Sequence, residues 1–258
     1  MNATTEPKIA TEQGHWYTRT GEPCYTVTAK NGEPRATTLR DARKLDLVPS
    51  VTTITKIKAA PGLNVWKEKQ ILLAALTLPR IAGETDEAFA ERVIEDSRAQ
   101  AKAAAERGTA LHGAIEKAIA GECPPEYLAH VIAIDRALIA VGVNILEGNA
   151  EHSFASSLGY GGKVDAHTAG WVVDFKTKDK IEDGKKLAYD QNIQLAAYAH
   201  GLGLQSPRCL NVFVGVEDAK VVVHEWAAEE IEIGWQMFKC CLNLWKLENN
   251  YDGGFRDE

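Results

Sequence analysis

One stretch constrains the fold of this chain more than any other, the eighteen residues 161–178 with the sequence GGKVDAHTAGWVVDFKTK. Apolar and polar residues alternate along it, which is typical of β-strands because side chains alternate between the two faces of a strand. The stretch predicts two short strands, Gly161–Thr168 and Trp171–Lys178, joined by a tight turn at Ala169-Gly170. The rest of the chain is therefore expected to build around a β-hairpin.

The register of this hairpin brings acidic side chains together. With a two-residue turn Thr168 lies opposite Trp171, so Asp165 lies opposite Asp174 with β-carbons about 5 Å apart. Two opposed carboxylates repel, and a divalent cation would remove that cost because hard cations take oxygen ligands. Lys176 points to the same side as Asp174, where its ammonium could hold a phosphate or lower the pKa of a water on the metal. The hairpin thus indicates a metal site with a catalytic lysine.

Two alternatives stay open for the hairpin. Ala-Gly is not the favoured pair for a two-residue turn, and a bulge would shift the register and move Asp165 off the face that carries Asp174. The D-x-K pattern is also compatible with a solvated polar face of an edge hairpin, because short motifs have high false-positive rates.

Composition restricts the class of protein. The chain has 258 residues, of which 45% are hydrophobic and 25% charged, as in ordinary soluble domains, and is long enough for one large or two small ones. A net charge of −7 argues against nonspecific coating of nucleic acid, although a local basic groove can occur on an acidic protein. Scattered cysteines indicate a reducing compartment. With no apolar signal or membrane-spanning run, the expected location is cytoplasmic.

The order of expected elements gives the fold class. A polar tail over residues 1–14 and a hairpin of His15–Thr18 with Cys24–Thr28 form an N-terminal extension over residues 1–47, and residues 48–258 form the main domain. The expected helices open at 48–52, with Ser50 or Thr52 as cap, and then cover Leu63–Leu76, Thr85–Ala120 with a break near Gly108, Pro125–Val143, Leu187–Leu204 and Glu229–Leu247. Further strands are expected at Asn144–Phe154, Arg208–Val216 and Lys220–Trp226. This order predicts an α/β fold with a central mixed sheet flanked by helices.

One predicted helix and one predicted loop carry further candidates. His112 and Glu116 are four residues apart and share a helix face. His112 is a candidate metal ligand that Glu116 could orient, or it is a structural or exposed histidine. Gly108 and Gly113 leave room for a close neighbour. The charged loop over residues 178–186 is either a flexible flap or a plain solvated loop.

Other polar and aromatic residues allow two interpretations each. The lysines of the first helices (Lys56, Lys58, Lys67 and Lys69) form either a solvated face or contacts to nucleic-acid phosphates. Gln191, Gln194 and Tyr198 lie on shared or adjacent helix faces, where they are either polar edges of a core helix or groups that bond phosphates or bases. The aromatic residues near the N-terminus (Trp16, Tyr17 and Tyr25) serve either packing or base stacking.

Six short motifs occur in the order seen in RecB-like PD-(D/E)XK nucleases. They are V-P-S-V-T at 48–52, W-K at 66–67, G-T-A-L-H-G-A-I-E at 108–116, G-K-V-D at 162–165, V-V-D-F-K-T at 172–177 and Q-L-A-A-Y at 194–198. Over residues 49–204 the chain resembles this superfamily, and within it the mitochondrial genome maintenance exonucleases and related bacteriophage exonucleases. The resemblance implies a restriction-endonuclease-like core and a Mg²⁺- or Mn²⁺-dependent deoxyribonuclease, an exonuclease acting at DNA ends in recombination, repair or replication.

The resemblance also implies roles for individual residues. The metal ligands that it implies are His112, Asp165, Asp174 and the backbone carbonyl of Phe175. Lys176 matches the catalytic lysine, and Glu116 matches an acidic helix position that is common but not universal in the superfamily. Gln194 and Tyr198 match a Q-x-x-x-Y motif that supports the site and contacts DNA. The full set of DNA-binding candidates is Gln191, Gln194, Tyr198, Ser50, Thr52, Lys56 and Lys67.

The same comparison bears on cofactors, partners and alternatives. One subgroup of the superfamily holds an iron–sulfur cluster, but Cys209, Cys240 and Cys241 lack the required C-terminal spacing after Cys24, so we expect none. The expected partner is DNA with linear ends, including single strands, with a single-strand annealing or single-strand-binding protein as a further candidate, and the location would be the host cytoplasm if a bacteriophage encodes the chain. A structure-specific endonuclease and a non-catalytic DNA-end-binding module are the alternatives; the complete set of site residues disfavours the latter.

Overall fold

A computed structural model describes residues 14–59 and 61–253; the polar tail predicted for residues 1–14 lies outside them except for Gly14. The centre of the molecule is a five-stranded sheet in the order β5-β6-β7-β8-β9. Its strands are β5 Asn149–Ser156, β6 Tyr160–His167, β7 Trp171–Lys178, β8 Arg208–Gly215 and β9 Val221–Trp226. Strands β7 and β8 are parallel and the other neighbours are antiparallel. The predicted mixed sheet is therefore confirmed.

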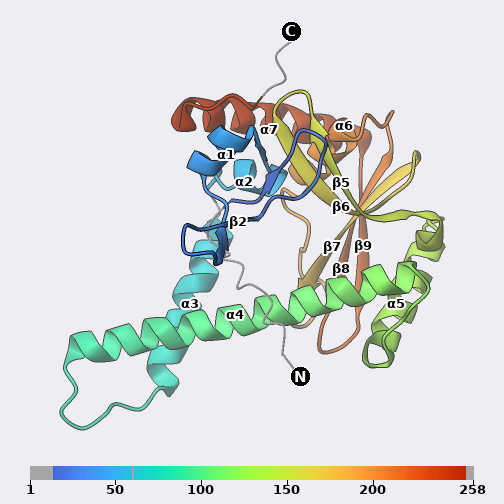
Figure 1. Cartoon of the computed structure of the whole chain (residues 1–258). Coiled ribbons are helices and arrows are strands. Elements are labelled where there is room, and N and C mark those ends of the chain that lie inside the picture. The colour runs from blue at the N-terminus through green and yellow to red at the C-terminus, as the bar shows by residue number, and fades with distance from the viewer. Residues whose placement is uncertain (1–13, 60, 254–258) are drawn as a thin grey trace.

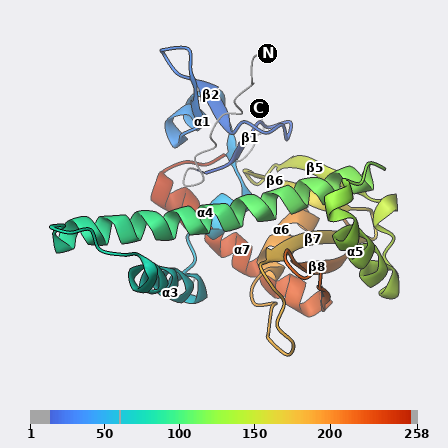
Figure 2. The same cartoon turned by 90° about the horizontal axis from the view of Figure 1, so that it is seen from below.

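Helices cover both faces of this sheet (Figure 1). They are α1 Leu39–Leu45, α2 Val51–Thr55, α3 Pro61–Thr77, α4 Asp86–Ile119, α5 Leu128–Ala140, α6 Asn192–Gly201 and α7 Ala228–Asn249, with short 3₁₀ turns η1 Pro125–Tyr127 and η2 Ile145–Glu147. Helices α6 and α7 lie on one face, and α4 and α5 lie on the other, as the view from below also shows (Figure 2). Within the described residues, no helix is long and apolar enough to cross a membrane.

Strand β7 is buried on both faces because each face has its own apolar core. Val172 packs into the core beneath α6 and α7, whereas Val173 and Phe175 pack into the core beneath α4 and α5. Leu111 of α4 is fully buried in this second core. The central strand that carries the predicted D-x-K motif is thus held rigidly between two helical layers.

The N-terminal segment pairs differently from the prediction. Four short strands form two small antiparallel ladders, β1 Trp16–Tyr17 with β4 Val48–Pro49 and β2 Thr26–Thr28 with β3 Pro34–Ala36. The predicted hairpin of His15–Thr18 with Cys24–Thr28 is confirmed only next to its turn, where Tyr17 bridges Pro23 in antiparallel fashion and Cys24 donates a backbone hydrogen bond to Trp16. Residues 26–28 pair with β3 instead. A three-residue loop over residues 30–32 closes β2 and β3, and Gly32 takes there a φ of 85°, the left-handed conformation that follows a type I turn in such a loop.

Residues of this segment belong to the main core. Trp16 is 3% exposed and meets the Trp245 ring of α7 edge-on with centroids 6.0 Å apart. Tyr251 donates a hydrogen bond to the Leu47 carbonyl at 2.5 Å. The packing interpretation of Trp16 is the one that the structure supports.

Helix α4 runs without interruption, so the predicted break near Gly108 is wrong. A glycine inside a helix costs only about 1 kcal/mol relative to alanine, which is too little to interrupt a long helix whose other residues favour helix formation. Gly108 lies where α4 crosses β7, and a β-carbon there would stand 2.6 Å from Thr177 Oγ1. Gly113 has no neighbour of this kind within 4 Å. The expected close approach therefore holds for Gly108 and is wrong for Gly113.

Helix α6 begins later than the predicted Leu187. Its first residue is Asn192, and Gln191 is the residue before the first turn. Residues 187–191 continue the preceding loop instead, and within it Gln191 Oε1 accepts a hydrogen bond from the Tyr189 N–H at 2.8 Å.

Candidate functional site

The register predicted for the hairpin is confirmed next to its turn. Ala166 pairs with Val173 and His167 pairs with Val172 across β6 and β7. This is the register that a two-residue turn at Ala169-Gly170 dictates, although Ala-Gly is not a favoured pair for such a turn.

Beyond these pairs the two strands separate. The backbone N–H of Phe175 donates to Asp165 Oδ2 at 2.7 Å. The N–H and C=O of one strand residue point to the same neighbour in an antiparallel ladder. The Phe175 carbonyl therefore faces the same gap, and the Asp165 carboxylate lies in the opening between β6 and β7.

The alternation of side chains is interrupted at Asp165. Val164 packs into the core beneath α6 and α7, whereas Ala166, two residues further, packs into the core beneath α4 and α5. On the other neighbouring strand, Glu151 takes a φ of 53°, yet the β5–β6 register is the same on both sides of it. The strand therefore turns over locally without the change of register that a bulge would produce. This places Asp165 within reach of both helical layers.

His112 approaches Asp165 from helix α4. Its Nδ1 lies 3.7 Å from Asp165 Oδ2, and its ring meets the Phe175 ring edge-on with centroids 6.2 Å apart. The side chain is 30% exposed, so it is open to a ligand. Glu116, one turn further along α4, is exposed. The structure thus brings His112 to Asp165 and leaves Glu116 at the surface.

Asp174 and Lys176 join the site to helix α6. Lys176 Nζ lies 2.8 Å from Asp174 Oδ2 and donates to Gln194 Oε1 at 3.0 Å. Gln194 Nε2 in turn donates to the Tyr198 hydroxyl at 2.7 Å. The two ends of the Q-x-x-x-Y motif and the lysine therefore form one hydrogen-bonded chain.

Two further residues of the site were not found from the sequence. Asn211 of β8 donates from Nδ2 to Asp174 Oδ2 at 2.7 Å and accepts from Trp226 Nε1 of β9 at 2.7 Å. Asn211 is 0% exposed. A single amide in the otherwise apolar run of β8 was the available signal, because a buried polar group needs a hydrogen-bond partner.

Charges in the site depend on one another. Burial alone would lower the pKa of the Lys176 ammonium, but the carboxylates of Asp174 and Asp165 outweigh burial and raise this pKa above its ordinary value. Burial and the nearby Asp174 raise the pKa of Asp165 to about 6. Burial, followed by both carboxylates, raises the pKa of Tyr198 well above its ordinary value. Lys176 is therefore a cation at neutral pH, and Tyr198 is a neutral phenol.

The donor set is compatible with a hard divalent cation in chemical type. Two carboxylates, an imidazole and a backbone carbonyl are ligands that Mg²⁺ or Mn²⁺ accepts, and the mutual repulsion of Asp165 and Asp174 is the cost that a cation removes. Over residues 14–59 and 61–253, no three His, Cys, Asp or Glu side chains are gathered closely enough to form a ready metal site. The donors lie instead in two groups: His112 lies beside Asp165, and Asp174 is paired with the Lys176 ammonium.

The predicted DNA-binding residues divide between an open hollow and other places. Thr52, Lys56, Gln191 and Gln194 line a hollow of about 670 Å³ between α2, the start of α3 and the start of α6. Ser50 is 3% exposed, and its hydroxyl caps α2 by accepting from the Thr53 N–H at 2.9 Å. The structure therefore confirms Ser50 as a helix cap.

Two more of these candidates lie outside the hollow. Tyr198 is 5% exposed and is hydrogen-bonded to the site through Gln194. Lys67 has an exposed side chain on α3. The basic residues of the first helices are therefore divided between the hollow and the outer surface of α3.

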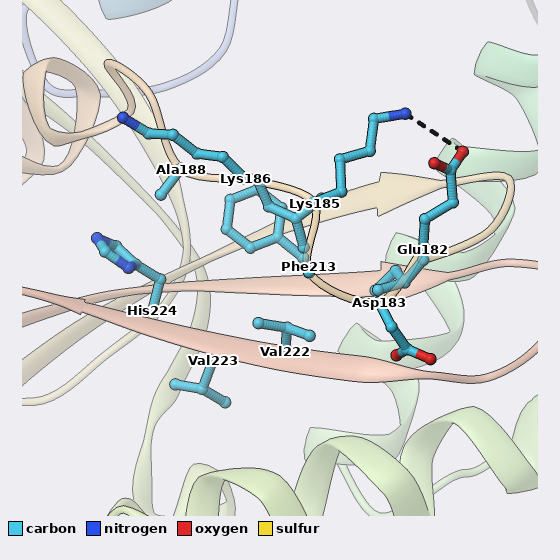
Figure 3. A pocket seen from close by; sticks show the side chains of 12 residues that line it. Glu182, Asp183, Lys185, Lys186, Ala188, Phe213, Val222, Val223 and His224 are labelled. Carbon is cyan, nitrogen blue, oxygen red and sulfur yellow. Dashed lines mark hydrogen bonds and ion pairs between the residues drawn. The ribbon is translucent and has the colours of Figure 1, made fainter.

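The charged loop after β7 is attached to the turn between β8 and β9. Ile181 is 4% exposed, and its N–H donates to Asp218 Oδ2 at 3.3 Å. Figure 3 shows the loop passing over β8 and β9, with the Lys185–Glu182 ion pair at its outer edge. The small pocket of about 320 Å³ beneath it is lined by the loop and by residues of β8 and β9 such as Phe213 and His224. This pocket shares no lining residue with the Asp165–Lys176 site.

Comparison with known proteins adds no assignment. No protein-family model matches the chain, and no curated protein sequence shows significant similarity to it. Function is therefore argued from the site itself.

Proposed function

We propose that the chain is a metal-dependent deoxyribonuclease with a PD-(D/E)XK core, acting as an exonuclease at DNA ends. The observation that carries this proposal is the hydrogen-bonded chain from Asp174 through Lys176 and Gln194 to Tyr198, beside the opening that holds Asp165. Two carboxylates can hold a metal ion, and a fixed cation beside them can stabilise the charge that develops in phosphodiester hydrolysis. The six motifs that resemble RecB-like nucleases contribute these same residues.

Lys176 has an electrostatic role in this proposal. Its ammonium lies beside the Asp174 carboxylate that would hold the metal, so in this proposal it stabilises negative charge that develops on the scissile phosphate. Asp174 and Gln194 hold the ammonium in place before the substrate arrives. Such preorganised charge is usually the largest single contribution to catalysis.

His112, Asp165, Asp174 and the Phe175 carbonyl are the residues that would hold a Mg²⁺ or Mn²⁺ ion. When bound, the ion supplies a Lewis acid for the phosphate oxygens and activates water. Asn211 and Trp226 fix the orientation of Asp174 from behind, as outer hydrogen-bond partners commonly do for metal ligands.

The experiment that tests this function is degradation of end-labelled linear DNA, single- and double-stranded, with a covalently closed circle as control. We expect loss of the linear DNA in Mg²⁺ and none in EDTA, with the circle left intact. Nicking of the circle would replace the exonuclease with an endonuclease. Binding to DNA without cleavage in Mg²⁺ or Mn²⁺ would contradict the proposed catalysis and favour a DNA-end-binding module.

A further inference from the structure

The hollow between α2, α3 and α6 has the size and chemistry of a small-molecule site. Its volume of about 670 Å³ falls within the range of roughly 300–1,000 Å³ typical of ligand pockets. The lining is mixed, with hydroxyl, amide, ammonium and aliphatic groups. The residues that the argument uses are Thr52, Thr55, Lys56, Leu63, Asn64 and Gln191.

The charges around the hollow favour a phosphate. Two ammonium groups, Lys56 and Lys58, line it, and the only carboxylate in the lining is Asp190. Asp190 pairs with Lys58 at 2.7 Å. In the part of the chain that the structure describes, no ion pair is found for Lys56, whose side chain is exposed. Lys56 therefore has no ion-pair partner among the described residues, in a protein whose net charge is −7.

The hollow adjoins the catalytic lysine through one shared residue. Gln194 lines the hollow and accepts a hydrogen bond from Lys176 Nζ at 3.0 Å. The hollow and the lysine therefore contact the same amide side chain. Leu63 and Ile193 give apolar surface for a base, and Asn64 and Gln191 give amides for its polar edge.

We propose that this hollow is a subsite for the terminal nucleotide of the DNA strand, and that it takes one nucleoside monophosphate unit. The phosphate lies near Lys56 and Thr52, and the base lies against Leu63 and Ile193. The inference rests on the proposed nuclease function and adds where the strand end is held.

The test is calorimetric titration of the full chain with thymidine 5′-monophosphate and, separately, thymidine 3′-monophosphate, in EDTA so that no metal-bound phosphate contributes. We expect one of the two to bind, and the one that binds identifies the strand end. Thymidine without phosphate should bind at least roughly tenfold more weakly, because a hydrogen bond to a charged group is lost.

Two variants locate the binding. Thr55→Trp fills the hollow and should abolish binding, and Lys56→Ala, at an exposed position, should weaken it roughly tenfold or more. Thr77→Trp is the matched control, because the Thr77 hydroxyl bonds a carbonyl of its own helix α3 as that of Thr55 does in α2. It should bind like the wild type. Thermal unfolding of each variant confirms that it is folded.

The outcomes separate this inference from the nuclease proposal. If the wild type degrades DNA but neither monophosphate binds, or if Thr55→Trp and Lys56→Ala both bind them like the wild type, the subsite is wrong and the nuclease stands. If the wild type degrades no DNA in Mg²⁺ or Mn²⁺, the nuclease proposal fails and the subsite fails with it.

Discussion

Asp174 is the most enclosed acidic side chain of the candidate site. It is 2% exposed, and its carboxylate bonds both Lys176 and Asn211. A buried charge is tolerated only when it is paired and hydrogen-bonded. Asn211 donates to this carboxylate from Nδ2, and its own Oδ1 accepts from Trp226 Nε1.

Asn211→Ala should therefore destabilise the protein strongly. It leaves the buried indole N–H of Trp226 without a partner, which costs about 1–3 kcal/mol, and it removes one of the two partners of Asp174 Oδ2, a hydrogen bond to a charged group that contributes about 1.5–3 kcal/mol. We expect a loss of about 3 kcal/mol in the free energy of unfolding, measured with urea. Asn31→Ala, at an exposed turn residue, is the control and should lose less than about 1 kcal/mol. Equal effects of the two substitutions would contradict the buried network.

Asp165 should make stability depend on pH. Its pKa is about 6 in the folded protein against an ordinary 3.8, so the fold favours the protonated carboxyl. The resulting stabilisation is complete below the ordinary pKa and is lost as the pH rises through the folded value. A shift of about two pKa units corresponds to about 3 kcal/mol.

Asp165→Asn tests this dependence because the amide stays neutral. In EDTA, the variant should gain up to about 3 kcal/mol relative to the wild type between about pH 4 and about pH 8. Urea unfolding at both pH values measures the gain. A stability difference that does not change with pH would show that Asp165 is not in the buried acidic environment described above.

At the scale of elements, the crossing of α4 over β7 sets the distance between His112 and Asp165. Gly108 permits the crossing, since a β-carbon would stand 2.6 Å from Thr177 Oγ1. Gly108→Ala should lower the free energy of unfolding by about 1 kcal/mol, because the clash outweighs the gain in helix propensity. Gly113→Ala, five residues further on the same helix and without a close neighbour, should instead be neutral or stabilising by up to about 1 kcal/mol. The same sign for both, by thermal or urea unfolding, would contradict the close packing.

The hairpin was predictable because two local rules agreed. Strand alternation located β7 at its observed bounds, and a two-residue turn fixed the pairing of Ala166 with Val173. The separation of β6 and β7 at Asp165 was not predictable, because it depends on helices α4 and α6 drawing neighbouring residues to opposite faces. The pairing of Trp16 with Pro49 was missed for a similar reason, since it joins segments far apart in the chain.

At the scale of the whole molecule, α3 and the first half of α4 form an arm that extends beyond the sheet (Figures 1 and 2). In α3 only Ala74 is buried, whereas Trp171 to Phe175 of β7 are all buried. Amide hydrogens of α3 should therefore exchange much faster than those of β7, because few buried contacts oppose local opening. Hydrogen exchange followed by mass spectrometry measures this. Equal protection of both segments would contradict the claim that few buried contacts hold α3 in place.

Much of the candidate site follows from short motifs, but its assembly does not. His112, Asp165, Asp174, Lys176, Gln194 and Tyr198 were all named from the sequence, and the contacts among them appear in the fold. Asn211 was missed because its role depends on β8 lying beside β7. The burial of Ser50 and the exposure of Glu116 likewise depend on which side of each helix meets the core, which the motif alone does not specify.

The most direct measurement of the central claim compares Lys176→Met with Lys178→Met in the hydrolysis of end-labelled linear DNA at saturating substrate in Mg²⁺. The two lysines lie on the same face of β7, but only Lys176 bonds Asp174 and Gln194. We predict that Lys176→Met lowers kcat by roughly 100-fold or more, the effect of removing a preorganised charge donor, whereas Lys178→Met changes kcat only a few-fold. Equal rates for both variants and the wild type would contradict a catalytic site at Lys176.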